Sequence, residues 1–256
     1  SATEDEEYSY SVEAEDVDVG DVILLSSVTL PSWLEFSVNG DGTGILSGTP
    51  LNANVGDTTV VLTVTDGTET VEQSFPITVE NTNDAPVFTS EAFTASTEDE
   101  EYSYSVEAED VDEGDELVIT ASTLPDWLEL EDNGNGTATL EGTPENEDVG
   151  EHDVVLRVTD ESGAFAVQSF MISVENTNDA PVFTSDAITS ATEDEEYSYI
   201  VTSEDVDAGD EILLSSVTLP SWLEFSANGD GTGILSGTPL NANVGDTTVV
   251  LTVTDG

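Results

Sequence analysis

The feature that most constrains this chain is an internal repeat of about 95 residues. The string TEDEEYSY occurs at residues 3–10, 97–104 and 192–199, at offsets of 94 and 95 residues. Trp33, Trp127 and Trp222 keep the same spacing. Self-similarity at a fixed period is typical of a tandem array in which each copy is one structural unit. The sequence therefore predicts three similar domains in a row.

The two outer copies are far more alike than either is to the middle one. Residues 2–67 and 191–256 differ at only 6 of 66 positions. The order A-B-A suggests a double period of 189 residues. The predicted domains are 1–84, which lacks its first strand, 85–179, which is complete, and 180–256, which lacks its last strand. We expect the chain to be part of a longer periodic polypeptide. The alternative is a chain whose ends simply fall inside its domains.

The hydrophobic pattern of each copy is that of β-strands. Residues 102–108 alternate apolar and polar side chains, as do residues 152–159 and 170–174. Turn sequences such as DNGNG and GTP separate these runs, and no stretch shows helical periodicity. About seven short strands per copy predict an all-β fold, a linear array of immunoglobulin-like sandwiches without the disulfide. The single Trp of each copy is predicted to anchor the core, with carbohydrate stacking as the alternative.

The charge balance excludes several classes of function. The chain has 57 Asp and Glu residues against one Arg, a net charge of −56. Nucleic-acid binding and docking on anionic lipid both need clustered basic residues. The absence of Cys excludes disulfides and thiolate metal sites. No apolar run is long enough to predict direct membrane insertion. A hydrophobic content of 37%, with aromatic residues in every copy, argues against disorder despite the acidity.

Three acidic motifs recur in every copy. They are TEDEE near the start, EDVDxGD after the first long strand, and the Asp that ends the VLxVTD strand. A fourth, NTND, lies between copies. Asp-x-Asp spacing brings two carboxylates to one side of a loop, and converging oxygen ligands favour Ca²⁺, or Mg²⁺ where waters are retained. Without His or Cys clusters, zinc, copper and iron are not expected. The alternative for each motif is a solvated charged edge or a polar turn.

The order of these motifs resembles a known family. TEDE, EDVDxG, VTD and NxNDAPVF follow one another as in the extracellular cadherin repeat. The stretch LPDWLELEDNGNGTATLEGTP is similar to the dystroglycan-type cadherin-like domain of microbial surface proteins. The resemblance implies a β-sandwich, an extracellular or cell-surface location, and Ca²⁺ bound between successive domains.

The resemblance also implies a ligand set at each junction. At the first junction it comprises Glu4, Asn83, Asp84, Asp110, Asp112 and Asp160. At the second it comprises Glu98, Asn178, Asp179, Asp205, Asp207 and Asp255. A half-site of Asp16, Asp18 and Asp66 is expected at the N-terminal end.

Two departures from the cadherin pattern bear on the number of ions. The linker NTNDAP is shorter than the family's DxNDNAP. The Asp-Arg-Glu loop is replaced by LNANVGD in the outer copies and by ENEDVGE in the middle one. Glu145 and Glu147 are candidate substitutes in the middle copy, and Asn52 and Asn54 are weaker candidates in the first. One or two ions per junction are therefore expected rather than three.

The expected function is that of an extracellular structural repeat. It would form the calcium-rigidified stalk of a large microbial adhesin or the body of a surface filament, with further repeats of the same polypeptide or like subunits as partners. The alternative is a module for polysaccharide binding or homophilic cell–cell adhesion, for which the few candidate residues are Phe93 and Phe165, both confined to the middle copy. No enzymatic activity is expected, because the acids recur in turns with no sign of a cleft and the chain has one His.

Overall fold

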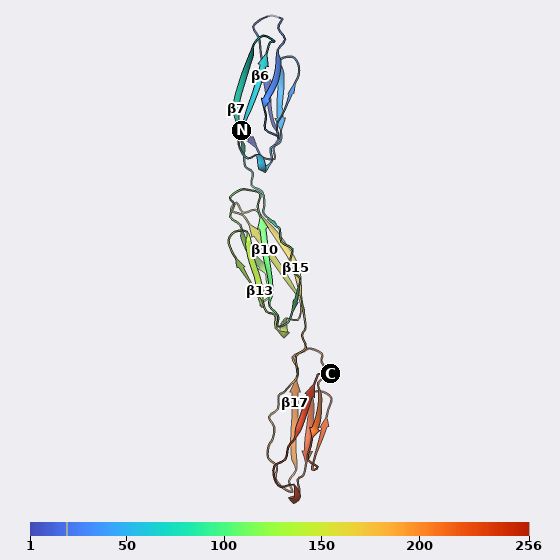
Figure 1. Cartoon of the computed structure of the whole chain (residues 1–256). Coiled ribbons are helices and arrows are strands. Elements are labelled where there is room, and N and C mark those ends of the chain that lie inside the picture. The colour runs from blue at the N-terminus through green and yellow to red at the C-terminus, as the bar shows by residue number, and fades with distance from the viewer. Residues whose placement is uncertain (19, 256) are drawn as a thin grey trace.

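The computed structural model describes residues 1–18 and 20–255. These residues are nearly all β and form three units that follow one another along an elongated molecule (Figure 1). Each of the first two units consists of two sheets that enclose its own hydrophobic core. The predicted fold class, a tandem array of immunoglobulin-like or cadherin-like sandwiches, is confirmed. Among the described residues, no helix has the length and apolar character needed to cross a membrane.

The first unit has one sheet of order β1-β7-β6-β3 and one of order β2-β5-β4. Its elements are β1 (Ala2–Thr3), β2 (Tyr8–Glu13), β3 (Leu24–Thr29), β4 (Glu35–Val38), β5 (Thr43–Gly48), the 3₁₀ helix η1 (Asn52–Asn54), β6 (Gly56–Thr65) and β7 (Thr70–Glu80). Strands β6 and β7 form a long antiparallel hairpin, and β1 adds to the outer edge of β7 in parallel.

The middle unit has the same plan with one more strand. Its elements are β8 (Val87–Phe88), β9 (Ala95–Thr97), β10 (Tyr102–Glu109), β11 (Val118–Thr123), β12 (Leu128–Asp132), β13 (Thr137–Gly142), η2 (Asn146–Asp148), β14 (Gly150–Thr159) and β15 (Phe165–Glu175). The sheets have the orders β11-β14-β15-β9 and β12-β13-β10-β8. The added β8 pairs with the end of β10.

The last unit repeats one sheet fully and the other only in part. Its elements are β16 (Val182–Phe183), β17 (Tyr197–Glu204), β18 (Leu213–Thr218), β19 (Leu223–Ala227), β20 (Thr232–Gly237), η3 (Asn241–Asn243) and β21 (Val250–Thr254). One sheet has the order β16-β17-β20-β19, whereas the second consists of β18 and β21 alone. Within the described residues, this unit has no counterpart of β7 or β15.

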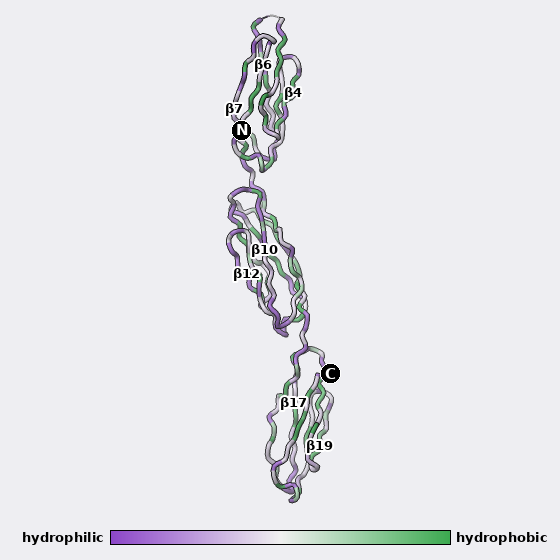
Figure 2. The backbone as a smooth tube through the Cα atoms, in the orientation of Figure 1, coloured by the Kyte–Doolittle hydropathy of each residue, from purple (hydrophilic) through white to green (hydrophobic). Residues whose placement is uncertain are grey.

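The cores are built by the alternation that the sequence shows. In β10, every second side chain from Tyr102 to Ala108 is buried and the others are exposed. Val154, Leu156 and Val158 face the same core from β14. Figure 2 shows apolar segments running inside each unit and hydrophilic ones at the turns and between units. Period-2 patterning thus decides which face of each strand is covered.

The Trp of each unit packs against the core, as predicted. Trp127 is partly buried and meets Tyr102 edge to face, with ring centroids 5.8 Å apart. Its backbone passes so close to Gly142 that a Cβ there would collide with the Trp127 carbonyl oxygen. This close approach explains the glycine of the GTP triplet, because only a residue without a side chain fits.

Candidate metal sites at the unit junctions

The TEDEE turn positions the first acidic ligand at each junction. Asp5 adopts a left-handed backbone (φ 58°), which Asp tolerates better than most residues, and its N–H donates to the carbonyl of Pro50 at 2.9 Å. This turn buries the carboxylate of Glu4, whose residue is 1% exposed. Asp99 repeats the arrangement with φ 61° and a bond to Pro144, and it buries Glu98 to the same extent.

At the first junction, residues of two units and the linker between them come together. The N–H of Thr82 donates to Glu4 Oε2 at 3.2 Å, and the N–H of Asp84 donates to Asp112 Oδ2 at 2.7 Å. Carboxylate oxygens of Glu4, Asp84 and Asp112 lie within 4.8 Å of one another. The structure therefore brings three predicted ligands, one from each part, to a single point.

The EDVDxGD loop of the middle unit forms a second acidic group beside the first. Oxygens of Asp110, Asp112 and Asp115 lie within 4.8 Å of one another, and the N–H of Asp112 donates to Asp110 Oδ1 at 3.0 Å. The Oδ2 atoms of Asp110 and Asp115 are buried without a hydrogen-bond donor among the described residues. Asp115 is absent from the predicted ligand set, although the last acid of the repeated EDVDxGD motif was a signal that could have included it.

Asp160 is held at the edge of the same junction. It accepts a bond from Asn83 Nδ2 at 2.9 Å, and its Oδ1 accepts the backbone N–H groups of Gly163 and Ala164 at 2.6 and 2.8 Å. Asn83 Nδ2 also donates to the carbonyl of Asp84 at 2.6 Å. The linker is thus tied to both acidic loops of the middle unit.

The second junction repeats these contacts between the middle and last units. Asp179 N–H donates to Asp207 Oδ2 at 2.6 Å, and Asn178 Nδ2 donates to Asp255 Oδ2 at 2.8 Å. The convergent acidic groups here are Glu98, Asp99 and Asp179, and separately Asp205, Asp207 and Asp210. Asp205 Oδ2 is buried without a donor among the described residues, as at the first junction. Asp99 and Asp210 lie outside the predicted set.

The predicted half-site is brought together only in part. Oxygens of Asp16, Asp21 and Asp66 lie within 4.8 Å of one another, at the end of the first unit away from the junction. Asp18 is exposed and is not part of this group, although its N–H donates to Asp16 Oδ1 at 2.8 Å. Asp21 takes the place that the prediction gave to Asp18.

An asparagine of the loop before β6 or β14 completes each junction. Asn52 Nδ2 donates to Asp112 Oδ1 at 3.0 Å, and Asn146 Nδ2 donates to Asp207 Oδ1 at 2.9 Å. Asn54 instead accepts the N–H of Leu51 at 2.9 Å within η1. Glu145 and Glu147, the candidates for the middle copy, are exposed. Asn146, which lies between these two glutamates, is the residue that reaches the junction.

The junction carboxyls titrate in opposite directions. Burial raises the pKa of Asp84 above its ordinary value, and the charges of Asp112, Asp5 and Asp110 add to the effect. The pKa of Asp115 is raised in the same way, by burial and then by Asp110 and Asp112. The pKa of Asp160 is lowered, chiefly because the Asn83 amide donates to its charged form. The negative charges of Asp84 and Asp115 are therefore less well stabilised than that of Asp160.

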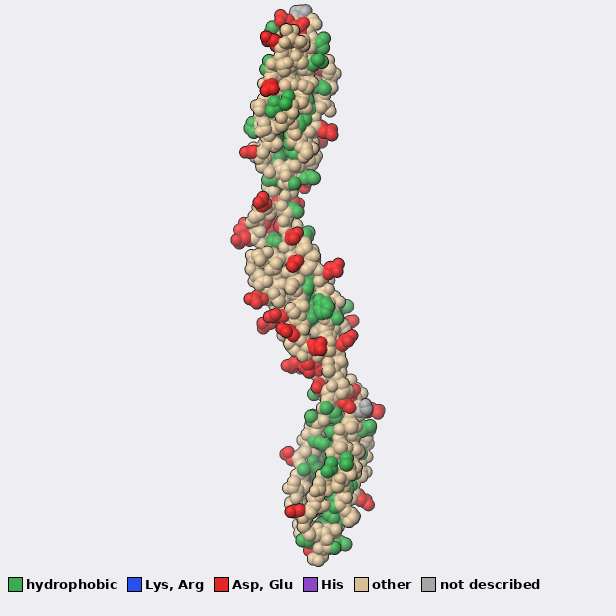
Figure 3. All heavy atoms as spheres, viewed as in Figure 1, with side chains coloured by type: hydrophobic (Ala, Val, Ile, Leu, Met, Phe, Trp, Pro, Cys, Tyr) green, Lys and Arg blue, Asp and Glu red, His purple; other side chains and the backbone are tan. Residues whose placement is uncertain are grey.

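This donor set fits a hard divalent cation. It consists of carboxylate oxygens without His or Cys, and Ca²⁺ takes about six to eight oxygens in flexible geometry. The buried oxygens of Asp110, Asp115 and Asp205 that have no donor within the described part of the chain are acceptors that a cation would satisfy. Figure 3 shows acidic side chains around both junctions and over the middle unit. Glu4, Asp84, Asp110, Asp112 and Asp115 would hold an ion at the first junction.

The sequence profile of the putative Ig domain matches residues 1–80, 85–175 and 180–256. The chain belongs to the putative Ig domain family. Three consecutive matches to one family agree with the three sandwiches of the fold. No protein among those with curated functions matches the chain.

Solved structures show the same fold in cadherin repeats. Repeats 3–6 of protocadherin gammaB7 match with a TM-score of 0.59 and 16% identity, over 100% of this chain and 67% of that one. The protocadherin GammaB4 extracellular domain matches with a TM-score of 0.57 and 19% identity, over 100% and 45% of the two chains. The resemblance of this putative Ig domain array to cadherin-like repeats is thus confirmed at the level of the fold.

A further similarity is to an endo-fucoidan hydrolase of glycoside hydrolase family 107. The identity is 26%, over 98% of this chain, and the TM-score is 0.37. The chain spans about two-fifths of that enzyme's length, the matched share being 41%.

Proposed function

We propose that this chain is an extracellular structural array whose unit junctions are stiffened by Ca²⁺. The observation that carries the proposal is the convergence of Glu4, Asp84 and Asp112 within 4.8 Å, from two units and their linker. In a chain with 57 acidic residues and one Arg, no side-chain cation is available to neutralise such a cluster in every copy. A divalent ion would do so and would tie the two units together.

The physical role of the ion follows from the charges on each side of the junction. Like charges a few ångströms apart repel strongly where protein excludes water, and bulk salt screens them only in part. Without an ion, this repulsion favours orientations that separate the units. With an ion, the same carboxylates become ligands of one centre and favour a single orientation. Ca²⁺ would therefore change the stiffness of the array more than the fold of a unit.

The experiment measures orientation at one junction directly. Because the chain has no Cys, spin labels can be placed at Val71→Cys and Val118→Cys, which are exposed positions on the first and middle units. We expect a narrow distance distribution with Ca²⁺ and a broad one with chelator. Small-angle scattering and thermal unfolding should show a stiffer and more heat-stable array with Ca²⁺. Identical distributions in both conditions would overturn the proposal.

The chain provides a matched control for the ligands. Asp110→Ala with Asp112→Ala should broaden the distance distribution across the first junction in the presence of Ca²⁺. Asp16→Ala with Asp18→Ala changes the same motif in the first unit, away from any junction in this chain, and should leave the distribution unchanged. Equal effects of the two pairs would show that loss of negative charge, rather than loss of a junction ligand, is responsible.

A stiff array of near-identical units suits a spacer. We propose the stalk of a large microbial adhesin or the body of a surface filament, with further repeats of the same polypeptide or like subunits as partners. The near-identity of the outer copies supports this, since a spacer needs length and stiffness rather than a different surface in each unit.

Polysaccharide or homophilic binding is the second candidate. Phe93 and Phe165 of the middle unit are 56% and 51% exposed, which favours a binding role for this unit alone. However, Phe93 stacks on Tyr102, and the guanidinium of Arg157 lies 3.9 Å from the centre of the Phe165 ring. A glycan array and a self-association assay distinguish the candidates. Binding that is lost in Phe93→Ala with Phe165→Ala would favour this second function.

A further inference from the structure

The outer face of one sheet of the middle unit is apolar in a chain that is otherwise strongly acidic. The sheet has the order β11-β14-β15-β9. On β15, Phe165, Val167 and Met171 point away from the core and are each about half exposed. At the positions of Val167 and Met171, the first unit has Glu72 and Pro76. The middle unit therefore presents an apolar sheet face that the first unit lacks.

This face carries the one Arg of the chain and an acid four residues away on the same strand. Arg157 and Asp153 both point outward from β14, with Val155 midway between them. The guanidinium of Arg157 lies 3.9 Å from the centre of the Phe165 ring, and its Nε is buried without an acceptor. A buried donor without an acceptor costs free energy, and more so when it is charged. Among the described residues, which include nearly all of the chain's acids, Arg157 forms no ion pair.

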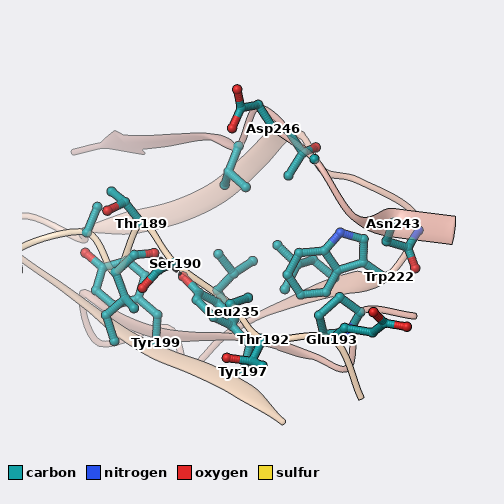
Figure 4. Close-up of a pocket in the computed structure, with 18 of the residues that line it drawn as sticks. Thr189, Ser190, Thr192, Glu193, Tyr197, Tyr199, Trp222, Leu235, Asn243 and Asp246 are labelled. Carbon is teal, nitrogen blue, oxygen red and sulfur yellow. Dashed lines mark hydrogen bonds between the residues drawn. The ribbon is translucent and has the colours of Figure 1, made fainter. Parts of the chain in front are cut away.

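The two outer units lack both of these charges. Threonine stands at the corresponding positions, 59 and 63 in the first unit and 248 and 252 in the last. In the last unit, the matching sheet consists of β18 and β21 alone among the described residues, and the core residues Trp222 and Leu235 border an open space (Figure 4). The sequences of the three units thus assign the charged pair to the middle unit.

We propose that this face binds the same face of a second copy of the chain. A two-fold axis that crosses β14 at Val155 sets this strand antiparallel to its symmetry mate. Arg157 of each copy then lies over Asp153 of the other, because the two residues are equally far from Val155. Such a contact is isologous, and the ion pair forms twice. The inference rests on the second candidate function, self-association, and not on calcium at the junctions.

The neighbouring strand extends the complementarity. Val167 pairs with Arg157 across the two strands, and Met171 pairs with Asp153. The same axis therefore packs Val167 of each copy against Met171 of the other. A shallow hollow of about 530 Å³ has Asp153, Val155 and Met171 among its walls, which is where the Arg157 and Val167 side chains of the second copy enter.

The charges favour a second copy over an acidic polysaccharide. A polyanion on Arg157 would bring further negative charges beside Asp153, whereas a second copy neutralises both residues at once. The next outward acid of β14, Glu151, lies over Thr159 of the second copy, so that the axis brings no two acids of this strand together. The remaining charges of two chains of −56 each repel over longer distances, and salt screens such repulsion beyond about 8 Å.

The size of the face predicts a weak dimer. Four strands about 4.8 Å apart and about ten residues long cover roughly 600 Å² per copy. A standard stable interface buries about 800 Å² per partner. Association should therefore depend on concentration, and a chemical cross-link is the direct way to detect it.

The test traps the contact at the two-fold axis. Because the chain has no Cys, Val155→Cys places a single thiol of each copy opposite the other, where a short bismaleimide can join them. Val61→Cys is the matched control, at the same partly exposed position of the first unit. In chelator, we expect Val155→Cys to form cross-linked dimer about tenfold faster, because association raises the effective concentration of the second thiol. Equal rates would overturn the proposal.

Charge reversal then tests the reciprocal pairs. In the Val155→Cys chain, Arg157→Asp alone and Asp153→Arg alone each set like charges opposite one another and should abolish the fast cross-linking. An equal mixture of the two variants should restore it, as should one chain with both changes, because opposite charges then meet again. A misfolded variant would not be rescued by mixing.

The remaining outcomes separate this site from the function on which it rests. A mixture that cross-links no faster than either variant would overturn the pairing of Arg157 with Asp153. Light scattering that still shows dimers of both single variants would overturn this face and leave self-association standing. Glycan binding that Arg157→Asp removes and mixing does not restore would assign Arg157 to a polysaccharide instead.

Discussion

At the scale of single residues, identical side chains behave differently because of the donors around them. Asp160 receives the Asn83 amide and two backbone N–H groups, whereas Asp115 Oδ2 has no donor among the described residues. The first arrangement favours the charged carboxylate and the second favours the protonated one. The junctions therefore contain acids whose charged form is stabilised by hydrogen-bond donors and acids that lack such donors among the described residues.

The raised pKa values predict how stability depends on pH when divalent ions are removed. The pKa is raised for four junction acids, Asp84, Asp115, Asp179 and Asp210. Just above pH 3.8, the folded state therefore binds more protons than the unfolded state. Stability should therefore rise as the pH falls from 7 toward about 4, because protonation removes the cost of burying these charges and then the repulsion between them. The pKa values of Asp160 and Asp66 are lowered, so the stability that these two carboxylates contribute is lost as the pH falls below 3.8. The expected melting temperature has a maximum near pH 4.

Calorimetry in buffers stripped of divalent ions measures this dependence. Asp115→Asn with Asp210→Asn should flatten the rise between pH 7 and 4, whereas Asp153→Asn, an exposed acid on β14, should not. In excess Ca²⁺ the rise should disappear, since metal binding favours deprotonated ligands. A melting temperature that falls steadily from pH 7 would contradict the prediction.

At the scale of elements, the strands were predictable and the junction loops were not. The alternation of residues 102–108 defines β10 because a strand exposes every second side chain, and this is a local property. The role of Asn52 depends on Asp112, 60 residues away in another unit, and no local pattern contains that contact. Similarly, η2 leaves Glu145 and Glu147 exposed, and it is Asn146 between them that contacts Asp207 of the next unit.

The candidate metal ligands were predictable to the extent that they form repeated motifs. Asp110 and Asp112 come together because Asp-x-Asp lies in one loop, and the linker acid Asp84 is held beside them by its backbone N–H, which donates to Asp112. Asp115 joins the acidic group of Asp110 and Asp112, and Asp21 joins that of Asp16 and Asp66. Both positions depend on the path of the turn. Residue type and spacing do not determine that path.

The close approach of Trp127 to Gly142 predicts a strong effect of a single methyl group. Gly142→Ala would place a Cβ against the Trp127 carbonyl oxygen, and backbone rather than a flexible side chain would have to move. We expect the middle unit to lose about 1–3 kcal/mol of unfolding free energy. Thr143→Ala, at the exposed neighbouring position, is the control and should change little.

Urea denaturation measures the effect of Gly142→Ala in the middle unit. Fluorescence of Trp127 reports on this unit alone in a chain that also carries Trp33→Phe and Trp222→Phe. A midpoint that matches that of the Thr143→Ala chain would refute the steric explanation.

At the scale of the whole molecule, each unit has a hydrophobic core of its own. The middle core has buried residues from β10, β11, β13, β14 and β15, and the core of the first unit has buried residues from β1, β2, β5, β6 and β7. Apolar area removed from water is the main stabilising term of a small domain. The stability of a unit therefore depends on its own core, whereas the contacts between units are polar contacts at the junctions.

The contacts at the two junctions have a consequence for how such a chain can change over generations. Asn52 meets Asp112 where an A copy precedes a B copy, and Asn146 meets Asp207 where a B copy precedes an A copy, at 3.0 and 2.9 Å. The interlocking residues are therefore the same in either order. Recombination between misaligned gene copies can add or delete whole repeats, and every new boundary inherits a complete set of partners. Length can then vary in steps of about 95 residues without any compensating substitution.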